Sequence, residues 1–378
     1  MLNFILPRTN IHLHEDIIYP HKNGMGEKKS IIGTRNIYIN NINEQINNFK
    51  VDWDIMNHIY YPYQFIGDVM KTASQEEEAQ DNPFFSLRYA MHLELHRFIN
   101  QEILYTDNAT KTLIFYGDDK YDLNSMNYLK NKNNKTICIK YDSTNIKKIL
   151  SKNYSSIDHI VIGSHSVDDN EDNYARISYI SVLYALCFQK HDGSSIIKLF
   201  NIDTPLSIGI LGLLTSMYLE VQIVKPITSK SDSAEIFVVC KKFLHINSNL
   251  FYRSFMNIIQ NLTKIEIDYE YEILQRGAIN LQLVNKINEI SIIFYQRRLE
   301  YIHTVLNTSF IQPHSEAKSL YANYFINENN TKVNTMMKNN IHKCIEWTSK
   351  YYKPIVFSSE INTIVLRHLY DIISVRNN

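Results

Sequence analysis

One lysine and one glutamate stand out because each interrupts an otherwise apolar strand pattern. Lys198 lies in the run Ser195–Phe200, and Glu235 begins the run Glu235–Phe243, which follows a turn rich in Ser, Lys and Asp. Both runs carry the β-branched and aromatic residues typical of buried strands. Burying a charge costs free energy unless an opposite charge accompanies it. The pattern therefore predicts either a structural ion pair or a catalytic site in which an amine works beside a carboxylate.

The elements that must position these two residues alternate along the chain. Strands are predicted at Thr112–Phe115, Thr136–Tyr141, His159–Ile162 and Ser195–Phe200. Helices are predicted around Leu123–Lys130, Ile146–Ser151, Tyr174–Gln189 and Ser207–Tyr218. Such alternation is typical of an α/β protein with a doubly wound, mostly parallel sheet, and the two strands after the last helix form an antiparallel hairpin.

The chain divides into three predicted regions. Residues 1–84 form an N-terminal extension with broken periodicity, and residues 85–244 form the α/β domain, which opens with an amphipathic helix at Phe85–Leu104. Residues 245–378 form a helical C-terminal region packed on the sheet, with a later helix from about Met336 to Tyr351. Its first long helix is indicated by apolar residues at three-to-four spacing, namely Leu283, Ile287, Ile290, Phe294, Ile302 and Leu306.

The segment from Gly193 to Phe243 carries two runs of letters at a fixed separation. They are Lys198-Leu199-Phe200, Thr204-Pro205, Ser207 and Gly209, and then Lys225-Pro226, Thr228-Ser229, Ser233, Glu235 and Val239-Cys240-Lys241. Letters and spacing resemble the FtsJ-type RNA 2'-O-ribose methyltransferases, most closely their cap-specific branch. The resemblance implies a Rossmann-like class I methyltransferase sheet, S-adenosylmethionine as cofactor and capped mRNA as substrate. The helical C-terminal region is similar to that of cap-methylating relatives from large DNA viruses.

The resemblance also implies a Lys-Asp-Lys-Glu tetrad around the ribose hydroxyl. Lys198 matches the second lysine, which removes the hydroxyl proton, and Glu235 matches the closing glutamate. The other two positions carry different residue types, Gly163 or Ser164 for the aspartate and Met91 or His92 for the first lysine. Since His159 and His165 flank the aspartate position, either could substitute as a base.

The predicted cofactor loop follows the strand at Thr112–Phe115. Glycines in such a loop let the backbone approach the cofactor closely, and this loop keeps Gly117 alone, followed by Asp118 and Asp119. Asp142, after the next strand, stands where these folds hold ribose hydroxyls. Because the two loop carboxylates would repel the carboxylate of S-adenosylmethionine, the sequence predicts weak cofactor binding.

Four lysines around the hairpin could contact RNA phosphates, as the matching basic positions do in the family, or could instead protect an edge strand. They are Lys225, Lys230, Lys241 and Lys242. Lysine plus arginine and aspartate plus glutamate number 39 each, so the net charge is zero and an RNA site must be local.

No metal site, signal segment or membrane span is predicted. The four cysteines are widely spaced, and the His12 and His14 pair lacks a third ligand at metal-binding spacing. The N-terminal apolar stretch is too short for a signal peptide, and no apolar run approaches the length of a membrane span. We therefore expect a cytoplasmic protein, with a viral factory or a virion as locations consistent with the viral resemblance.

Two functions of different classes stay open. The first is an enzyme that methylates ribose 2'-hydroxyls near the mRNA cap, with Lys198 as base and Glu235 as the group that orients it. The second is a non-catalytic, methyltransferase-shaped subunit that binds RNA or acts as a scaffold in a capping or polyadenylation complex. The single loop glycine and the two replaced tetrad positions favour the second.

Overall fold

The computed structural model describes fourteen stretches of the chain. They are residues 1–11, 17–22, 41–42, 44, 60–74, 86–99, 111–116, 135–140, 155–163, 171–246, 249–262, 271–275, 277–310 and 331–352. Their contacts form two compact units. The sheet unit comprises Met1–Ile32, Leu95–Ile227 and Ala234–Tyr295, and the helical unit comprises Gly33–Glu94, Thr228–Ser233 and Gln296–Asn378.

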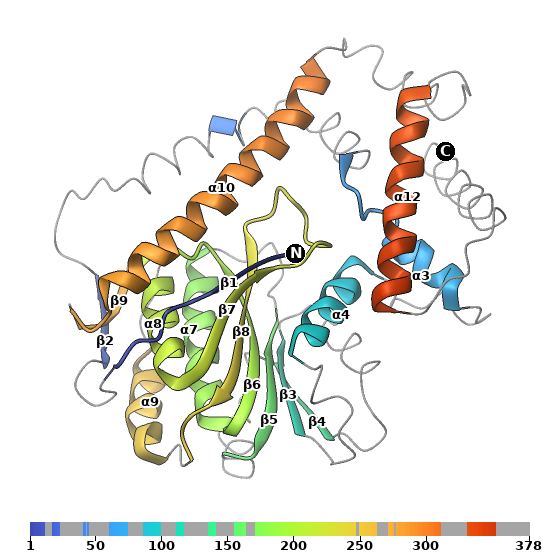
Figure 1. Ribbon diagram of the computed structural model, residues 1–378. Coiled ribbons are helices and arrows are strands. Elements are labelled where there is room, and N and C mark those ends of the chain that lie inside the picture. The colour runs from blue at the N-terminus through green and yellow to red at the C-terminus, as the bar shows by residue number, and fades with distance from the viewer. Residues whose placement is uncertain are drawn as a thin grey trace. The chain divides into compact units, whose positions relative to one another are not determined.

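A mixed seven-stranded sheet forms the centre of the sheet unit (Figure 1), in the order β1-β7-β8-β6-β5-β3-β4. Four neighbouring strands are parallel: β4 (Lys135–Lys140), β3 (Lys111–Tyr116), β5 (Ile157–Ile162) and β6 (Gln189–Phe200). The antiparallel part consists of β8 (Glu235–Phe243), β7 (Tyr218–Lys225) and β1 (Leu2–Ile5). The sheet and its helices confirm the α/β, Rossmann-like class.

Three helices bury one face of this sheet. They are α7 (Glu171–Phe188), α8 (Pro205–Met217) and α9 (Asn249–Leu262), which Figure 1 shows grouped together beside the strands. Their apolar side chains share one hydrophobic core with alternate strand residues such as Ile197 and Leu199 of β6. Because side chains alternate across a strand, Lys198 lies on the opposite face of the sheet.

The start of α8 is specified locally. The hydroxyl of Thr204 accepts a hydrogen bond from the Ser207 backbone N–H at 3.2 Å, and Pro205 occupies the first helical position. A threonine cap satisfies a donor that the helix itself leaves unpaired, and proline is well suited to a position that needs no N–H. The Thr-Pro-x-Ser letters of the sequence are therefore a helix-initiation signal directly after β6.

The N-terminal region contributes more structure than the irregular extension that we expected. Its β1 pairs antiparallel with β7 as the edge of the sheet, where Phe4 makes an edge-to-face contact with Phe294. A second strand, β2 (Ile17–Lys22), pairs with β9 (Tyr271–Leu274) in a separate two-stranded sheet. β1 has only four residues, too few for its alternation to stand out in a sequence.

The described residues of the C-terminal region are mainly helical, as the periodicity predicts. The long helix α10 (Leu281–Phe310) buries Leu283, Ile287 and Ile290 in the main core. The later helix α12 (Thr331–Tyr351) packs on α3 (Ile66–Ser74) within the helical unit, and α4 (Leu87–Ile99) matches the predicted helix before the sheet. The segments Leu123–Lys130 and Ile146–Ser151, predicted as helices, lie outside the described residues.

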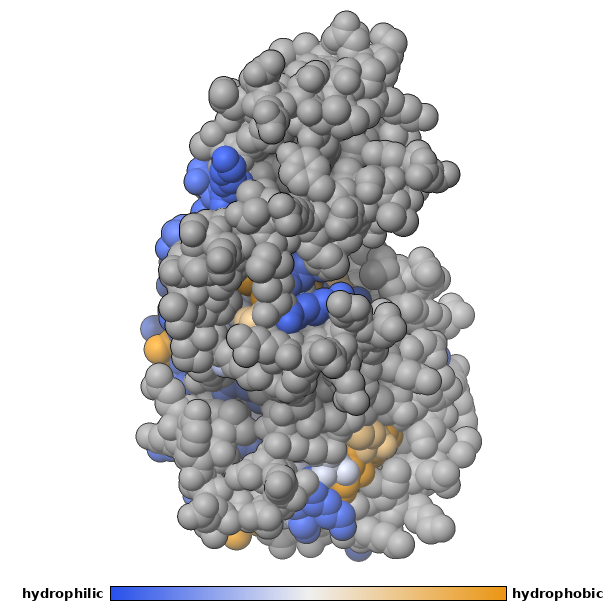
Figure 2. All heavy atoms as spheres, turned by 90° about the vertical axis from the view of Figure 1, so that its right-hand side faces the viewer, coloured by the Kyte–Doolittle hydropathy of each residue, from blue (hydrophilic) through white to orange (hydrophobic). Residues whose placement is uncertain are grey.

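The helices of the described stretches include none that is both long and apolar enough to cross a membrane. On the face shown in Figure 2, the coloured atoms of described residues form small hydrophilic and hydrophobic groups rather than a broad apolar area.

Candidate functional site

Lys198 and Glu235 form a buried ion pair. Lys198 lies near the end of β6, opposite Phe237 of β8, and Glu235 opens β8 two residues before Phe237 on the same face. Lys198 Nζ lies 2.7 Å from Glu235 Oε2, and the two side chains are 6% and 11% exposed. The antiparallel pairing of β6 with β8 thus brings together two charges that are far apart in the sequence.

Two further side chains surround this pair. The ring centroid of Phe200 lies 5.1 Å from Lys198 Nζ, which places the ammonium group over an aromatic face. Lys225, at the end of β7, donates a hydrogen bond from Nζ to the backbone carbonyl of Glu235 at 3.0 Å. Glu235 is therefore held through its carboxylate by one lysine and through its backbone by another.

The pair lies at the carboxyl ends of the parallel strands. In the order of the strands, only β5 separates β6 from the switch point between β5 and β3. The chain passes from β3 to β4 on one side, whereas β5 and β6 lie on the other side of β3. Open α/β sheets bind ligands in the crevice outside the strand ends at such a point. Gly163, directly after β5, donates its N–H to the Phe115 carbonyl at 2.9 Å, so it ends β5 beside β3 and contributes no side chain.

Several predicted site residues lie outside the described residues. Gly117 follows β3 directly and Asp142 comes two residues after the end of β4, but neither is described. Ser164, His165 and the histidines of the N-terminal pair are likewise not described. Their roles stay predictions. The described residues include no group of three or more His, Cys, Asp or Glu side chains that could hold a metal ion.

Two of the four lysines of the predicted RNA surface, Lys225 and Lys241, lie far apart along the hairpin. Lys241 pairs with Glu220 across the hairpin, with an ion pair of 3.1 Å. At a rise of roughly 3.3 Å per residue, this position is about 16 Å along the hairpin from Lys225. Lys242 is exposed next to Lys241, and Lys230 belongs to the helical unit. Lys225 contacts the ion pair through the backbone of Glu235.

His159 is wrongly predicted as a substitute base. It lies near the start of β5 opposite Ser194, whose hydroxyl is 2.7 Å from His159 Nδ1. Lys198 is about 13 Å further along the neighbouring strand, at roughly 3.3 Å per residue. Burial lowers the pKa of His159 to about 4, with Asp158 opposing the shift. The histidine is a neutral, buried residue at the opposite end of the strands.

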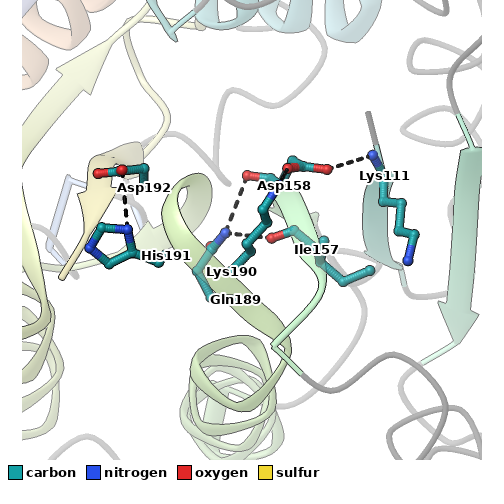
Figure 3. A network of polar contacts seen from close by, with 7 residues as sticks. All are labelled: Lys111, Ile157, Asp158, Gln189, Lys190, His191 and Asp192. Carbon is teal, nitrogen blue, oxygen red and sulfur yellow. Dashed lines mark hydrogen bonds and ion pairs between the residues drawn. The ribbon is translucent and has the colours of Figure 1, made fainter. Parts of the chain in front are cut away.

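A polar network at that opposite end, shown in Figure 3, was missed by the sequence reasoning. Asp158 accepts hydrogen bonds from the Lys111 backbone N–H and from Lys190 Nζ, both at 2.9 Å. The Gln189 amide donates to the carbonyls of Ile157 and Asp158 at 2.9 and 3.2 Å. These contacts hold the start of β6 against β5 and β3.

The network also explains why Gly193, in the segment that resembles the methyltransferase family, is a glycine. A Cβ atom on Gly193 would collide with Gln189 Nε2 and would lie 2.8 Å from the Asp158 carbonyl oxygen. Tyr218 Oη donates to Gln189 Oε1 at 2.9 Å, which completes the hydrogen bonds of the amide. Gly193 is therefore required by packing around Gln189, at the end of β6 remote from Lys198.

Comparison with known proteins gives local similarities. No protein-family model matches the chain. A segment of 66 residues, 18% of the chain, is 36% identical to the inactive cap-specific mRNA (nucleoside-2'-O-)-methyltransferase 1B of Caenorhabditis briggsae. Similar segments are 35% identical over 66 residues to the cap-specific methyltransferase 1 of Caenorhabditis elegans and 32% identical over 76 residues to methyltransferase 2 of Drosophila melanogaster.

The matched segments span only 8%, 7% and 11% of the lengths of these three relatives, in the order given. They are nevertheless all segments of cap-specific mRNA methyltransferases or of an inactive form of one. Together with the mixed α/β sheet, these similarities support a methyltransferase relationship for this chain.

Proposed function

We propose that this protein methylates RNA at a ribose 2'-hydroxyl near the mRNA cap. The observation that carries the proposal is the Lys198–Glu235 ion pair, buried where β6 ends and β8 begins. A buried ion pair is a weak source of stability, because the desolvation of two charges offsets most of their attraction. An ion pair at the ligand-binding edge of an α/β sheet therefore favours a chemical role over a structural one.

The roles of the two residues follow from their contacts. Lys198, in its neutral amine form, accepts the proton that the ribose hydroxyl loses when its oxygen is methylated, and it thereby becomes the ammonium group that pairs with Glu235. Glu235 lies 2.7 Å from Lys198 Nζ, so it orients this group and stabilises its charge once the proton has arrived. Lys225 holds the backbone of Glu235 and thereby keeps the carboxylate in place.

S-adenosylmethionine would supply the methyl group as an electrophile attached to its positively charged sulfur. The described residues are compatible with a cofactor crevice between β3 and β5, because Gly163 ends β5 without a side chain that would fill it. In the proposal, the loop with Gly117 contacts the methionine part and Asp142 binds the ribose hydroxyls. The same proposal covers partners and location. The partners would be capped mRNA and capping or polyadenylation proteins, and the location would be the cytoplasm, a viral factory or a virion.

One observation favours a second candidate function. Gly163, rather than an aspartate, ends β5 and donates its backbone N–H to Phe115. The tetrad that the family resemblance implies would then lack one of its acids beside Lys198. One of the similar proteins is itself named an inactive methyltransferase. The second candidate is therefore a non-catalytic RNA-binding or scaffolding subunit.

A methyl-transfer assay with labelled S-adenosylmethionine and capped RNA separates the two candidates. We expect transfer by the parent protein and a loss of about 100-fold or more in Lys198→Ala, the usual effect of removing a general base. Lys190→Ala is the matched control, because it changes an exposed lysine at the other end of the same strand. A parent protein that binds capped RNA but transfers no methyl group would support the scaffold and exclude the enzyme.

Cofactor binding can be measured independently by calorimetric titration. We expect weak binding by the parent and tighter binding by the double variant Asp118→Asn/Asp119→Asn, because it removes negative charge near the cofactor carboxylate. A parent protein that binds as tightly as the double variant would show that these two loop acids do not face the cofactor.

A further inference from the structure

The connection from β6 to α8 starts at the ring that covers the Lys198 amine. Phe200 is the last residue of β6, it pairs with Glu235 of β8, and its ring centroid lies 5.1 Å from Lys198 Nζ. The next residue, Asn201, has a φ of 54°, in the left-handed region that asparagine adopts more readily than most residues. The chain therefore turns away from the strand directly after Phe200, and the residues beyond the turn determine how firmly that ring is held.

Three successive residues hold this connection within the sheet unit. Ile202 is buried in the main core, and Thr204 caps the start of α8. Between them, Asp203 Oδ2 accepts a hydrogen bond from Ser291 Oγ of α10 at 2.7 Å. Ser291, Asp203 and the site residues all belong to the sheet unit. The hydrogen bond therefore joins the connection to a helix that is 88 residues away in the sequence.

Ser291 occupies a position of α10 where an apolar residue would be expected. It follows Ile290 and lies one helical turn beyond Ile287, and both of these side chains enter the main core. Ser291 is only 8% exposed. A buried hydroxyl costs free energy unless it is hydrogen-bonded, and a carboxylate is a stronger acceptor than a neutral group. The Ser291–Asp203 contact therefore fixes both of its segments.

We propose that Ser291 is a positioning residue for the Lys198 site, acting through Asp203 and Phe200. While the hydrogen bond is intact, the connection after β6 is fixed and the Phe200 ring stays over the Lys198 amine. Without the hydroxyl, the connection opens more readily and the ring uncovers the amine. The importance of this effect for catalysis rests on the proposed function, but the covering of the amine can be observed without any activity.

The test measures how fast Lys198 is acylated, with Lys190 as the exposed reference lysine in the same protein and peptide mass spectrometry as the readout. Lys198 should be protected in the parent. In Ser291→Ala, we expect about tenfold faster acylation, since a hydrogen bond to a charged group can shift a local opening equilibrium by that factor. Ser291→Thr, which keeps a hydroxyl, should restore protection.

The route through Asp203 is tested by a second pair of variants. Asp203→Ala removes the acceptor of the same hydrogen bond, so it should accelerate acylation of Lys198 as much as Ser291→Ala does. The double variant Asp203→Ala/Ser291→Ala should be no faster than either single variant, because the bond is already absent in each. A further tenfold increase in the double variant would show that Ser291 does not act through Asp203.

The matched control is Ser194→Ala. Ser194 is also buried in the sheet unit, and its hydroxyl lies 2.7 Å from His159 Nδ1. It lies on the same strand as Lys198 but about 13 Å away, at roughly 3.3 Å per residue. The same substitution there should leave Lys198 protected. Equal protection in parent and Ser291→Ala, or equal loss of protection in Ser194→Ala, would overturn the proposal. Absence of methyl transfer by the parent would refute the enzymatic function while leaving this result intact.

Discussion

Gly209 of α8 and Ile273 of β9 approach so closely that no methyl group fits between them. A Cβ atom on Gly209 would lie 2.5 Å from Ile273 Cγ1 and 3.1 Å from its Cδ1. The short two-stranded sheet therefore depends on this glycine to reach the surface of the helix. The glycine of the family-like Thr-Pro-x-Ser-x-Gly run is thus explained by packing rather than by ligand binding.

Replacing Gly209 by alanine should destabilise the protein despite the higher helix propensity of alanine. We expect a loss of about 1 to 3 kcal/mol in the free energy of unfolding, the usual range for overpacking a core. Gly212→Ala is the matched control, because its Cβ would meet the nearest atom, Ile279 Cδ1, at 3.2 Å. Urea unfolding of both variants tests this, and an equal or larger loss in Gly212→Ala would contradict it.

Substitutions of Lys198 and Glu235 should have strongly non-additive effects on the free energy of unfolding. Lys198→Met leaves the carboxylate of Glu235 buried beside an apolar side chain, and we expect a loss of about 3 kcal/mol. The double variant Lys198→Met/Glu235→Leu should be more stable than Lys198→Met alone, because it removes the unpaired charge. A double-mutant cycle by urea unfolding measures the coupling, and additive losses would show that the two charges do not interact.

Stability should fall in mild acid because of His159. Burial holds its pKa at about 4, below the ordinary 6.5, so the unfolded chain takes up a proton before the folded protein does. Its contribution is complete above pH 6.5 and is lost progressively as the pH falls toward 4, by about 3 kcal/mol in total.

The variant His159→Gln should lose less stability than the parent between pH 7.5 and pH 5 in urea unfolding. His342→Gln is the control, because it changes an exposed histidine, and it should follow the parent. Identical pH dependence in parent and His159→Gln would mean that the buried ring does not determine acid stability.

If the lysines contact RNA phosphates, two separate groups of lysines should contribute to the affinity for RNA. Removing one lysine–phosphate interaction should reduce the slope of log affinity against log salt by about 0.7 to 0.9. We expect Lys241→Ala/Lys242→Ala and Lys225→Ala/Lys230→Ala to flatten the slope additively, because Lys241 and Lys225 lie at opposite ends of the hairpin. Lys198→Ala should leave the slope unchanged. Filter binding over a salt series measures this, and a slope unchanged in both double variants would exclude the lysines as RNA-binding residues.

Much of the fold could be predicted because its signals are local. The three-to-four spacing of Leu283 and Ile287 predicts α10, and the apolar run around Lys198 predicts the second half of β6. Lys198 and Glu235 lie side by side because the second strand of the hairpin, β8, pairs with the parallel strand β6. These features need only the periodicity of each segment and the usual topology of alternating strands and helices.

Other features depend on contacts that no local pattern records. Thr228 reads as an ordinary turn residue, yet it is buried by Tyr61 and Glu94, which are far away in the sequence. His159 lies in the predicted strand, but only the strand register shows that it faces Ser194 rather than the site. The separation of Lys225 from Lys241 likewise requires the length of the hairpin.

The register of β6 against its neighbours β5 and β8 determines which way Lys198 faces. Side chains alternate between the two faces of a sheet, so a slip of β6 by a single residue would exchange every inward and outward position of the strand. Lys198 would then enter the apolar layer beside α7 and α8, and Leu199 or Ile197 would take its place. The pairing of Ile196 and Ile197 with β5 on one side and β8 on the other would be broken by such a slip. The two neighbouring strands therefore decide whether Lys198 meets Glu235 or is buried in the apolar core.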